Sequence, residues 1–245
     1  MTPARIAELL RPFLSDDPKK EAAVLPPFLT KQISTYIDIL LRWNARINLT
    51  AIRDPEEIVT RHFGESLFAA RRLFPDAPND LRNDDVRNSD VRNRKADLRG
   101  STSERISAIR AADLGSGAGF PGLPIKLWAP QISMTLIESN HKKAAFLREL
   151  VRSLRLTDVN IESVRAETLS QTYDVVTLRA VERFPDILPV AARLLSPGGQ
   201  LLLLTSRRHR EPSHSILPEI SWKPAILVPD SQSRILEIGV REPQL

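Results

Sequence analysis

Residues 111–122 of the chain read AADLGSGAGFPG, in which four glycines follow a short apolar run. The run at residues 109–114 predicts a strand, and residues 123–128 predict a helix. Alternating glycines let the backbone turn tightly and approach a bound molecule without interference from a Cβ atom. The stretch therefore predicts a strand, a turn and a helix, with a ligand bound at the turn.

Strands and helices continue to alternate after this turn. Four further strands are expected at residues 134–137, 159–163, 174–178 and 200–204, with helices at 142–154 and 186–195. Residues 225–228 and 235–240 predict a closing antiparallel hairpin. Alternation of this kind indicates a sheet covered on both faces. We therefore expect an α/β, Rossmann-like fold with a mostly parallel seven-stranded sheet over residues 106–245.

The first 105 residues differ from this pattern. Residues 1–75 predict an N-terminal helical cap, in which Asp54 is the N-cap of a helix that has Pro55 at its first position. Residues 76–105 contain three successive pentapeptides, DLRND, DVRNS and DVRNR, whose period suits neither a strand nor a helix. We interpret this stretch as a flexible insertion; an RNA-contacting arm and an ordered segment are the alternatives.

Two classes of ligand compete for the glycine turn. Gly117 begins a G-x-G-x-x-G pattern, with Glu138 placed as a dinucleotide site requires. Asp113, however, ends its strand with a carboxylate that suits an amino-acid ammonium group, which S-adenosylmethionine (SAM) has and NAD lacks. Glu138 ends the second strand, where it can accept hydrogen bonds from both ribose hydroxyls. These acids favour SAM over a dinucleotide or a purely structural turn.

Several motifs together resemble the RsmG (GidB) family of SAM-dependent ribosomal RNA guanine-N7 methyltransferases. They are Arg42-Trp43-Asn44 with Asn48-Leu49-Thr50, Arg61-His62 with Glu65-Ser66, residues 113–122, Arg148, Arg165-Ala166-Glu167 and Arg179-Ala180. The resemblance covers roughly residues 30–75 and 108–204. It implies a class I SAM-dependent methyltransferase fold, 16S ribosomal RNA in the small subunit as partner, and methylation of a guanine N7.

Carried over by position, the family's SAM contacts fall on Gly115, Phe120, Ala166, Glu167 and Arg179. The resemblance also places Arg179 close to the methyl-transfer site, so we expect it to be catalytic. The physical argument above adds Asp113, Gly117 and Glu138 to the cofactor-binding residues.

Three features depart from the family pattern. Glu65 stands where relatives have Asp beside Ser66, and the insertion at residues 76–105 lies where relatives are short. After the fifth strand, relatives often have Lys-Gly, whereas residues 205–210 of this chain read TSRRHR. These arginines are either phosphate contacts or a solvated loop.

Composition limits the chemistry. A net charge of +5 and a pI of about 9.8 favour a polyanionic partner. The chain has no cysteine, which excludes methylation through a Cys adduct, and with four histidines we expect no metal site. Residues 177–181 lack the Asn/Asp-Pro-Pro-Tyr sequence that orients an exocyclic amine, which agrees with N7 as acceptor. No signal peptide or membrane span is predicted, so we expect a cytoplasmic protein. We also expect the chain to be a monomer.

Arginines of the cap are expected to contact RNA phosphates; they are Arg42, Arg46, Arg53, Arg61, Arg71 and Arg72. His62, Trp43 and Trp128 are expected to pack in the core. Two other functions stay open: a methyltransferase for small molecules, and a non-catalytic ribosome-assembly factor that retains a SAM pocket.

Overall fold

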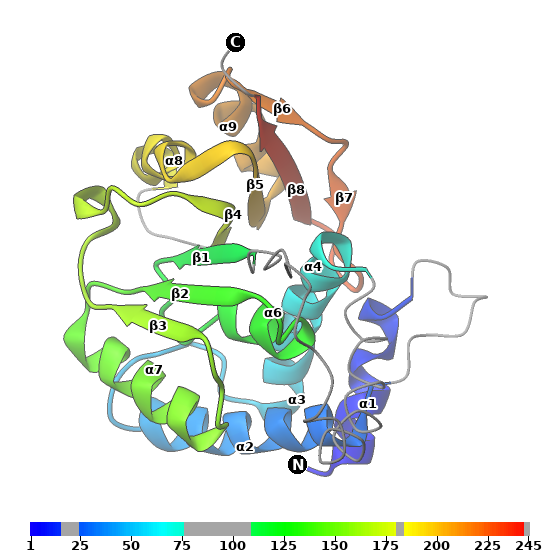
Figure 1. The fold of residues 1–245 in the computed structure, drawn as a ribbon. Helices are drawn as coiled ribbons and strands as arrows, with labels where there is room; N and C mark the ends of the chain where they lie inside the picture. The colour runs from blue at the N-terminus through cyan, green and yellow to red at the C-terminus, as the bar shows by residue number, and fades with distance from the viewer. Residues whose placement is uncertain (16–24, 76–108, 180–183, 243–245) are drawn as a thin grey trace, which may run out of the picture.

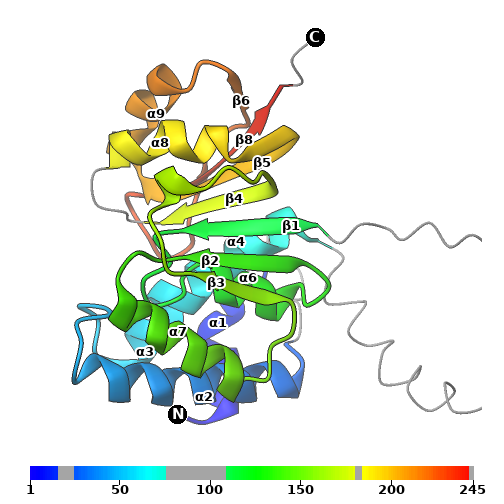
Figure 2. The same cartoon turned by 60° about the vertical axis from the view of Figure 1, so that its left-hand side comes forward.

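One twisted sheet lies between two layers of helices (Figures 1 and 2). The structure is a computed structural model and describes residues 1–15, 25–75, 109–179 and 184–242. Within this part of the chain, eight strands pair in the order β3-β2-β1-β4-β5-β8-β6, and β7 also pairs with β8. Their bounds are β1 Arg110–Leu114, β2 Ser133–Ile137, β3 Val159–Glu162, β4 Tyr173–Arg179, β5 Leu195–Ser206, β6 Ile220–Trp222, β7 Ile226–Leu227 and β8 Arg234–Arg241.

Strands β1 to β5 are parallel to their neighbours, whereas β8 runs antiparallel to β5, β6 and β7. The expected α/β, Rossmann-like class with a mostly parallel sheet is confirmed, and so is the closing β7–β8 hairpin. The expected count of seven strands is wrong, because β6 is an eighth strand. Residues 220–222 lie between Pro218 and Pro224 and are too few to show the alternation of a strand.

Helices cover the sheet on both faces. The α-helices are α1 Pro3–Leu10, α2 Pro27–Asn44, α3 Pro55–Glu57, α4 Glu65–Leu73, α6 Gly122–Trp128, α7 His141–Ser153, α8 Phe184–Arg193 and α9 Arg210–Ile216. Short 3-10 helices are η1 Arg11–Phe13, η4 Ala166–Thr168 and η5 Arg207–His209, and η2 Ile58–Gly64 is a π-helix that joins α3 to α4.

Side chains of β1 alternate between two cores, as a strand buried on both faces requires. Ala111 joins the core formed with α1, α2 and α6, whereas Ala112 and Leu114 join the core formed with α8. In Figure 2 these helical layers lie on opposite sides of the sheet, with α8 and α9 on one side and α2, α6 and α7 on the other. The carboxyl ends of the parallel strands therefore meet at one edge, where ligands bind in folds of this kind.

The N-terminal helices belong to the same core as the sheet. Ile6 of α1, Ile33 of α2 and Phe63 of η2 are fully buried together with Met134 of β2. The expected insertion at residues 76–105, and the boundaries drawn around it, lie outside the described residues.

The helix that begins after Asp54 contains a π-helical turn. Asp54 is its N-cap, as expected: its Oδ1 accepts a hydrogen bond from the backbone N–H of Glu57 at 2.8 Å. From Ile58 to Gly64 the hydrogen bonds are π-helical. Such turns are rare and are frequent at functional sites. This one carries Arg61 and His62 and leads directly to Glu65.

Candidate active site

The glycine turn after β1 has the conformation that its sequence predicts. Gly115, Gly117 and Gly119 have φ angles of +66°, +54° and +88°, which L side chains adopt at a cost. A Cβ atom at Gly117 would meet no atom closer than 3.7 Å, whereas one at Gly119 would overlap the hydroxyl of Tyr36. The turn is therefore packed on the side of α2 and open at Gly117, where a ligand can approach the backbone.

Glu138, just after β2, is joined to this turn. Its Oε2 accepts a hydrogen bond from the N–H of Gly117 at 2.9 Å, and its Oε1 accepts one from the N–H of Asn140 at 2.8 Å. The residue is 7% exposed. A carboxylate has about four acceptor positions, so each oxygen can still accept a bond from a ligand hydroxyl.

A pocket of about 440 Å³ opens between the ends of β1, β2 and β3. Four of the predicted residues line it: Gly115, Glu138, Ala166 and Glu167. Val164 adds an apolar wall that is 37% exposed. The combination of an apolar wall, glycine backbone and a fixed carboxylate fits the adenosine part of SAM.

Asp113 lies beneath the glycine turn and does not line this pocket. It is fully buried, its Oδ1 accepts a hydrogen bond from Thr177 Oγ1 at 2.7 Å, and its Oδ2 accepts one from the N–H of Gly122 at 3.2 Å. Burial raises its pKa to about 6, although these hydrogen bonds act in the opposite direction. The sequence predicts that Asp113 contacts a ligand ammonium; in the structure its carboxylate accepts hydrogen bonds from Thr177 and from the turn itself.

Phe120 connects the turn to the N-terminal helices through an aromatic cluster of Tyr36, His62, Phe63 and Phe120. Its ring stacks on Tyr36 at a centroid distance of 5.2 Å and on His62 at 4.7 Å, and it meets Phe63 edge-on at 5.1 Å. The guanidinium carbon of Arg179 lies 6.0 Å from the Phe120 centroid. The structure thus brings Phe120 and Arg179 together, at the end of β4.

The Trp-Asn…Asn-Leu-Thr motif has a structural explanation that leads to this cluster. Asn44 Oδ1 accepts hydrogen bonds from the N–H groups of Leu49 and Thr50, and its Nδ2 donates to the Thr50 carbonyl at 2.9 Å. This closes the loop after α2 and fixes Thr50, whose Oγ1 lies 2.8 Å from His62 Nε2. The motif therefore orients the ring that stacks on Phe120.

His62 is held neutral. Burial lowers its pKa to about 3, and the nearby Arg179, Arg61 and Arg234 act in the same direction. His62 Nδ1 is buried without a hydrogen-bond partner in the described part of the chain. The core position expected for His62 agrees with its contacts to Phe120 and Thr50.

A depressed histidine pKa predicts how stability depends on pH. Between about pH 6.5 and 3, His62 binds a proton in the unfolded state but not in the folded state. The contribution of the neutral, buried His62 ring to stability is therefore fully present above pH 6.5 and is lost as the pH falls toward 3. We expect the free energy of unfolding to fall less between pH 7.5 and 4.5 in His62→Asn than in the parent protein, measured by urea unfolding. An NMR titration of the His62 ring with an inflection near pH 6.5 would contradict this.

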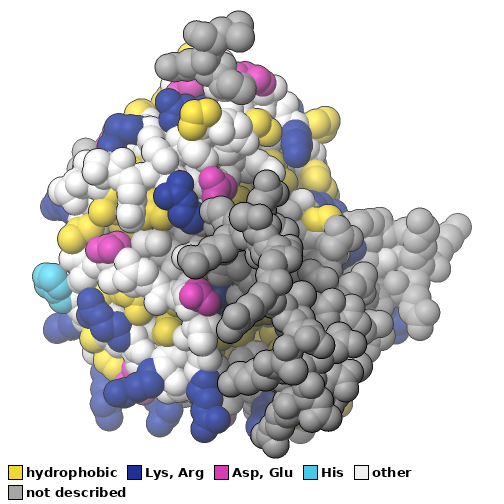
Figure 3. Space-filling model, viewed as in Figure 1, with side chains coloured by type: hydrophobic (Ala, Val, Ile, Leu, Met, Phe, Trp, Pro, Cys, Tyr) yellow, Lys and Arg dark blue, Asp and Glu magenta, His cyan; other side chains and the backbone are white. Residues whose placement is uncertain are grey.

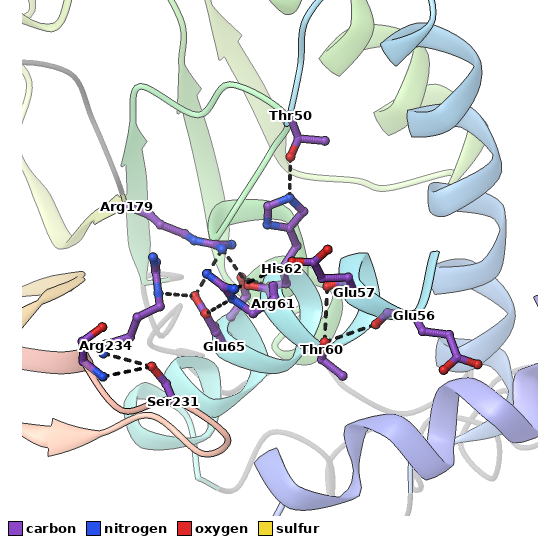
Figure 4. A network of polar contacts seen from close by, with 12 residues as sticks. Thr50, Glu56, Glu57, Thr60, Arg61, His62, Glu65, Arg179, Ser231 and Arg234 are labelled. Carbon is purple, nitrogen blue, oxygen red and sulfur yellow. Dashed lines mark hydrogen bonds and ion pairs between the residues drawn. The ribbon is translucent and has the colours of Figure 1, made fainter. Parts of the chain in front are cut away.

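Arg179 belongs to a buried charge cluster, which we call the Glu65 cluster (Figure 4). Glu65, at the start of α4, has a side chain that is only 2% exposed. Its Oε2 lies 3.1 Å from Arg179 Nη2 and 2.9 Å from Arg234 Nε, and its Oε1 accepts a hydrogen bond from Arg61 Nε at 3.2 Å. One carboxylate therefore joins the π-helix, the end of β4 and the start of β8.

The Arg179 guanidinium is fixed and only partly satisfied. Its Nη2 donates to the carbonyl of Arg61 at 2.6 Å, its side chain is 7% exposed, and its Nη1 is buried without a partner among the described residues. Burial lowers its pKa to about 10 although Glu65 opposes the shift, so Arg179 stays charged at neutral pH. Nη1 is therefore a donor that no described group uses.

The sequence marks Glu65 only as a departure from a family motif, and it gives no sign that Arg234 belongs to the site. Arg234 lies far along the chain in the closing hairpin, and no pattern in the sequence connects it with Glu65. The contact follows from the topology, because β8 returns antiparallel to β5 and so places Arg234 opposite Ser206 at the carboxyl edge.

The arginines of the N-terminal segment have different surroundings. Arg42, Arg46 and Arg53 are exposed. Arg71 donates to the carbonyl of Phe13, whereas Arg72 donates to the carbonyl of Phe68 and lies over its ring. Figure 3 shows Lys and Arg side chains gathered over α2 and α7, where Arg42, Lys142 and Arg148 are exposed.

Trp128 is 2% exposed and its Nε1 donates to the carbonyl of Phe74 at 2.9 Å. Trp43 is partly buried and meets Phe146 edge-on at 5.8 Å. Both pack in the core, as expected.

Fold and site together define a class of protein. A Rossmann-like sheet with an open glycine turn after β1, an acid closing β2 and an antiparallel last strand is the architecture of class I, SAM-dependent methyltransferases.

Within this class, the family description "GidB: rRNA small subunit methyltransferase G" matches residues 29–79 and 100–216. The chain belongs to this family, and the resemblance expected from its motifs is confirmed.

Individual relatives have the same name as the family. The chain is 39% identical over 171 residues to Ribosomal RNA small subunit methyltransferase G of Xylella fastidiosa (strain 9a5c), covering 69% of this chain and 65% of that protein. It is 38% identical over 186 residues to the protein of the same name from Stenotrophomonas maltophilia (strain K279a), covering 75% and 70%. The matched region thus spans about two thirds of the length of these relatives.

Among solved structures, the chain is similar to P. horikoshii TYW2 in complex with MeSAdo, with a TM-score of 0.48 and 14% identity over 55% of this chain and 58% of that chain. It is also similar to M. jannaschii TYW2 in complex with AdoMet, with a TM-score of 0.45 and 13% identity over 54% and 68%.

Two expected absences can be compared only with the described residues. In that part of the chain no helix is long and apolar enough to cross a membrane. No group of His, Asp and Glu side chains suitable for a metal ion occurs there either.

Proposed function

We propose that the chain transfers the methyl group of SAM to N7 of a guanine in 16S ribosomal RNA of the small ribosomal subunit. The observation that carries the proposal is that one glycine turn, residues 115–120, connects two sites in a member of this family. One is the pocket at Gly115 and Glu138, and the other is the partly satisfied Arg179 beside the aromatic cluster.

The pocket residues divide the binding of SAM among them. Glu138 accepts hydrogen bonds from the ribose hydroxyls, while Ala166 and Glu167 border the adenine. Gly115 lines the pocket and the open backbone at Gly117 lets the cofactor approach the turn, while Asp113 holds that turn through its hydrogen bond with Gly122. When bound, SAM supplies an electrophilic methyl group on a sulfonium.

Alignment is the main requirement of the reaction, because the charge already present on the sulfonium is passed on and not created. Guanine N7 carries a free lone pair and O6 is a neighbouring acceptor, so no general base is required. In this proposal Arg179 Nη1 donates to the guanine O6 and orients the base, and the Glu65 cluster keeps the guanidinium in place.

The helices of residues 1–15 and 25–75 act as a cap that contributes Arg61, His62 and Glu65 to the site. The chain acts as a monomer in the cytoplasm, where small subunits are assembled.

Radiolabelled SAM tests the proposal directly. Small ribosomal subunits that lack the modification are incubated with SAM carrying a tritiated methyl group, and the labelled RNA is mapped for N7-methylguanosine. We expect label in one guanine with the parent protein and little with Arg179→Met. A protein that binds SAM in calorimetry but transfers no label to RNA would instead be a non-catalytic assembly factor, and label transfer only to small molecules would contradict an RNA substrate.

A further inference from the structure

A second, larger pocket lies at the end of β5. It has a volume of about 920 Å³ and is lined by Arg207, Arg208, Arg210, His214, Leu227 and Ile235. None of its lining residues belongs to the pocket at Gly115 and Glu138. It is formed by η5, α9 and the β7–β8 hairpin.

This pocket opens at the same sheet edge as Arg179. Arg179 pairs with Leu204 in the sheet, and β5 ends at Ser206, two residues further on. Two strand residues span about 7 Å. Arg207, which follows Ser206 and whose N–H donates to the Ser233 carbonyl at 2.9 Å, therefore lies close to the carboxyl ends of the strands that carry the proposed reaction site.

A buried carboxylate organises the pocket. The side chain of Glu237 is fully buried, and its Oε1 lies 2.9 Å from His214 Nε2 and 3.5 Å from Arg210 Nε. The His214 ring stacks on Trp222 with a centroid distance of 4.7 Å and an interplanar angle of 9°. His214 and Arg210 are thus held in position, and Arg210 is balanced by Glu237.

Two further arginines supply uncompensated charge. Arg207 and Arg208 are exposed, and neither forms an ion pair with any residue that the structure describes. Glu211 is the one acid that lines the described part of the pocket rim. Beside these charges lie apolar groups, including Leu227, which is 45% exposed. A positive rim with an apolar wall suits a nucleotide, whose phosphodiester and base or sugar need these two surroundings.

We propose that this pocket binds the phosphodiester backbone of the RNA substrate next to the nucleotide that is methylated. The inference rests on the proposed function, because it assigns a substrate contact to the same reaction. Arg207 and Arg208 each bind a backbone phosphate, and the apolar wall at Leu227 contacts the adjoining nucleoside. Residues 205–210, which depart from the family pattern, thereby acquire a role.

Paired charge removal tests the proposal. The double variant Arg207→Gln/Arg208→Gln is compared with Arg152→Gln/Arg155→Gln, which removes the same charge from exposed arginines around the end of α7, at the opposite sheet edge. We expect the first variant to raise KM for small ribosomal subunits about tenfold or more and to lower the slope of log affinity against log salt by about 1.5, as the loss of two phosphate contacts predicts. SAM affinity should not change, and the control should leave KM near that of the parent.

Three outcomes would overturn the proposal: equal KM values for the two double variants, an unchanged salt slope, or binding of inorganic phosphate at this pocket without any change of KM in the variant. The last outcome would indicate a free anion as ligand. If the parent protein transfers no methyl group at all, the proposed function fails by itself. Filter binding of small-subunit RNA to the same variants then still decides whether the pocket binds a phosphodiester.

Discussion

Glu65→Ala is expected to lower the free energy of unfolding by about 3–5 kcal/mol, as for a buried ion pair that loses one partner. Glu65 is the carboxylate that faces Arg61, Arg179 and Arg234, and its removal takes from the buried Arg179 guanidinium its ion-pair partner. The measurement is urea unfolding followed by circular dichroism.

Glu57→Ala is the matched control. Glu57 lies two turns earlier in the same helix and its side chain is 49% exposed. Its Oε1 lies 3.8 Å from Arg61 Nη1. Exposed pairs contribute about 0–1 kcal/mol, so the control should unfold almost like the parent. Similar losses for the two variants would show that burial of the cluster does not matter.

Glu138→Ala is expected to lower the affinity for SAM about 100-fold. Two hydrogen bonds from the ribose hydroxyls to a carboxylate contribute about 1.5 kcal/mol or more each, and each 1.4 kcal/mol corresponds to about a factor of ten. The substitution also frees the N–H groups of Gly117 and Asn140, which loosens the turn itself. Calorimetric titration with SAM measures the change.

Glu162→Ala is the control for this experiment, because Glu162 ends the neighbouring strand β3 and does not line the pocket. It should bind SAM as the parent does. Glu138→Gln keeps one acceptor oxygen, so its affinity for SAM should lie between that of Glu138→Ala and that of the parent. SAM binding by Glu138→Ala at parental affinity would remove the basis for placing the ribose at this acid, and thermal melts check that each variant is folded.

Much of the fold follows from local patterns. The strand, turn and helix at residues 109–128 were predictable because alternating glycines and apolar runs act within a few residues. The same holds for the N-cap at Asp54. Four of the predicted cofactor-binding residues line one pocket because the ends of parallel strands meet at one sheet edge.

Other features depend on contacts between distant segments, which local patterns do not contain. The contact of Arg234 with Glu65 requires the antiparallel return of β8, and the π-helical turn at residues 58–64 interrupts what the apolar spacing presents as a regular helix. Asp113 illustrates a second difficulty. Its position at the end of a strand is correct, but only the packing of Thr177 and Gly122 around it shows that its carboxylate is already engaged.

The short strands β6 and β7 have a consequence for solubility at high concentration. An exposed sheet edge offers unpaired backbone groups to other chains and favours aggregation. Here β6 covers residues 239–241 of β8 and β7 covers residues 235–236, while Lys223 donates its N–H to the Ile238 carbonyl between them. The short strands β6 and β7 thus cover β8 over most of its length. Deleting residues 220–227 should expose the backbone of β8 to pairing with other chains and promote aggregation, while the SAM pocket stays in place.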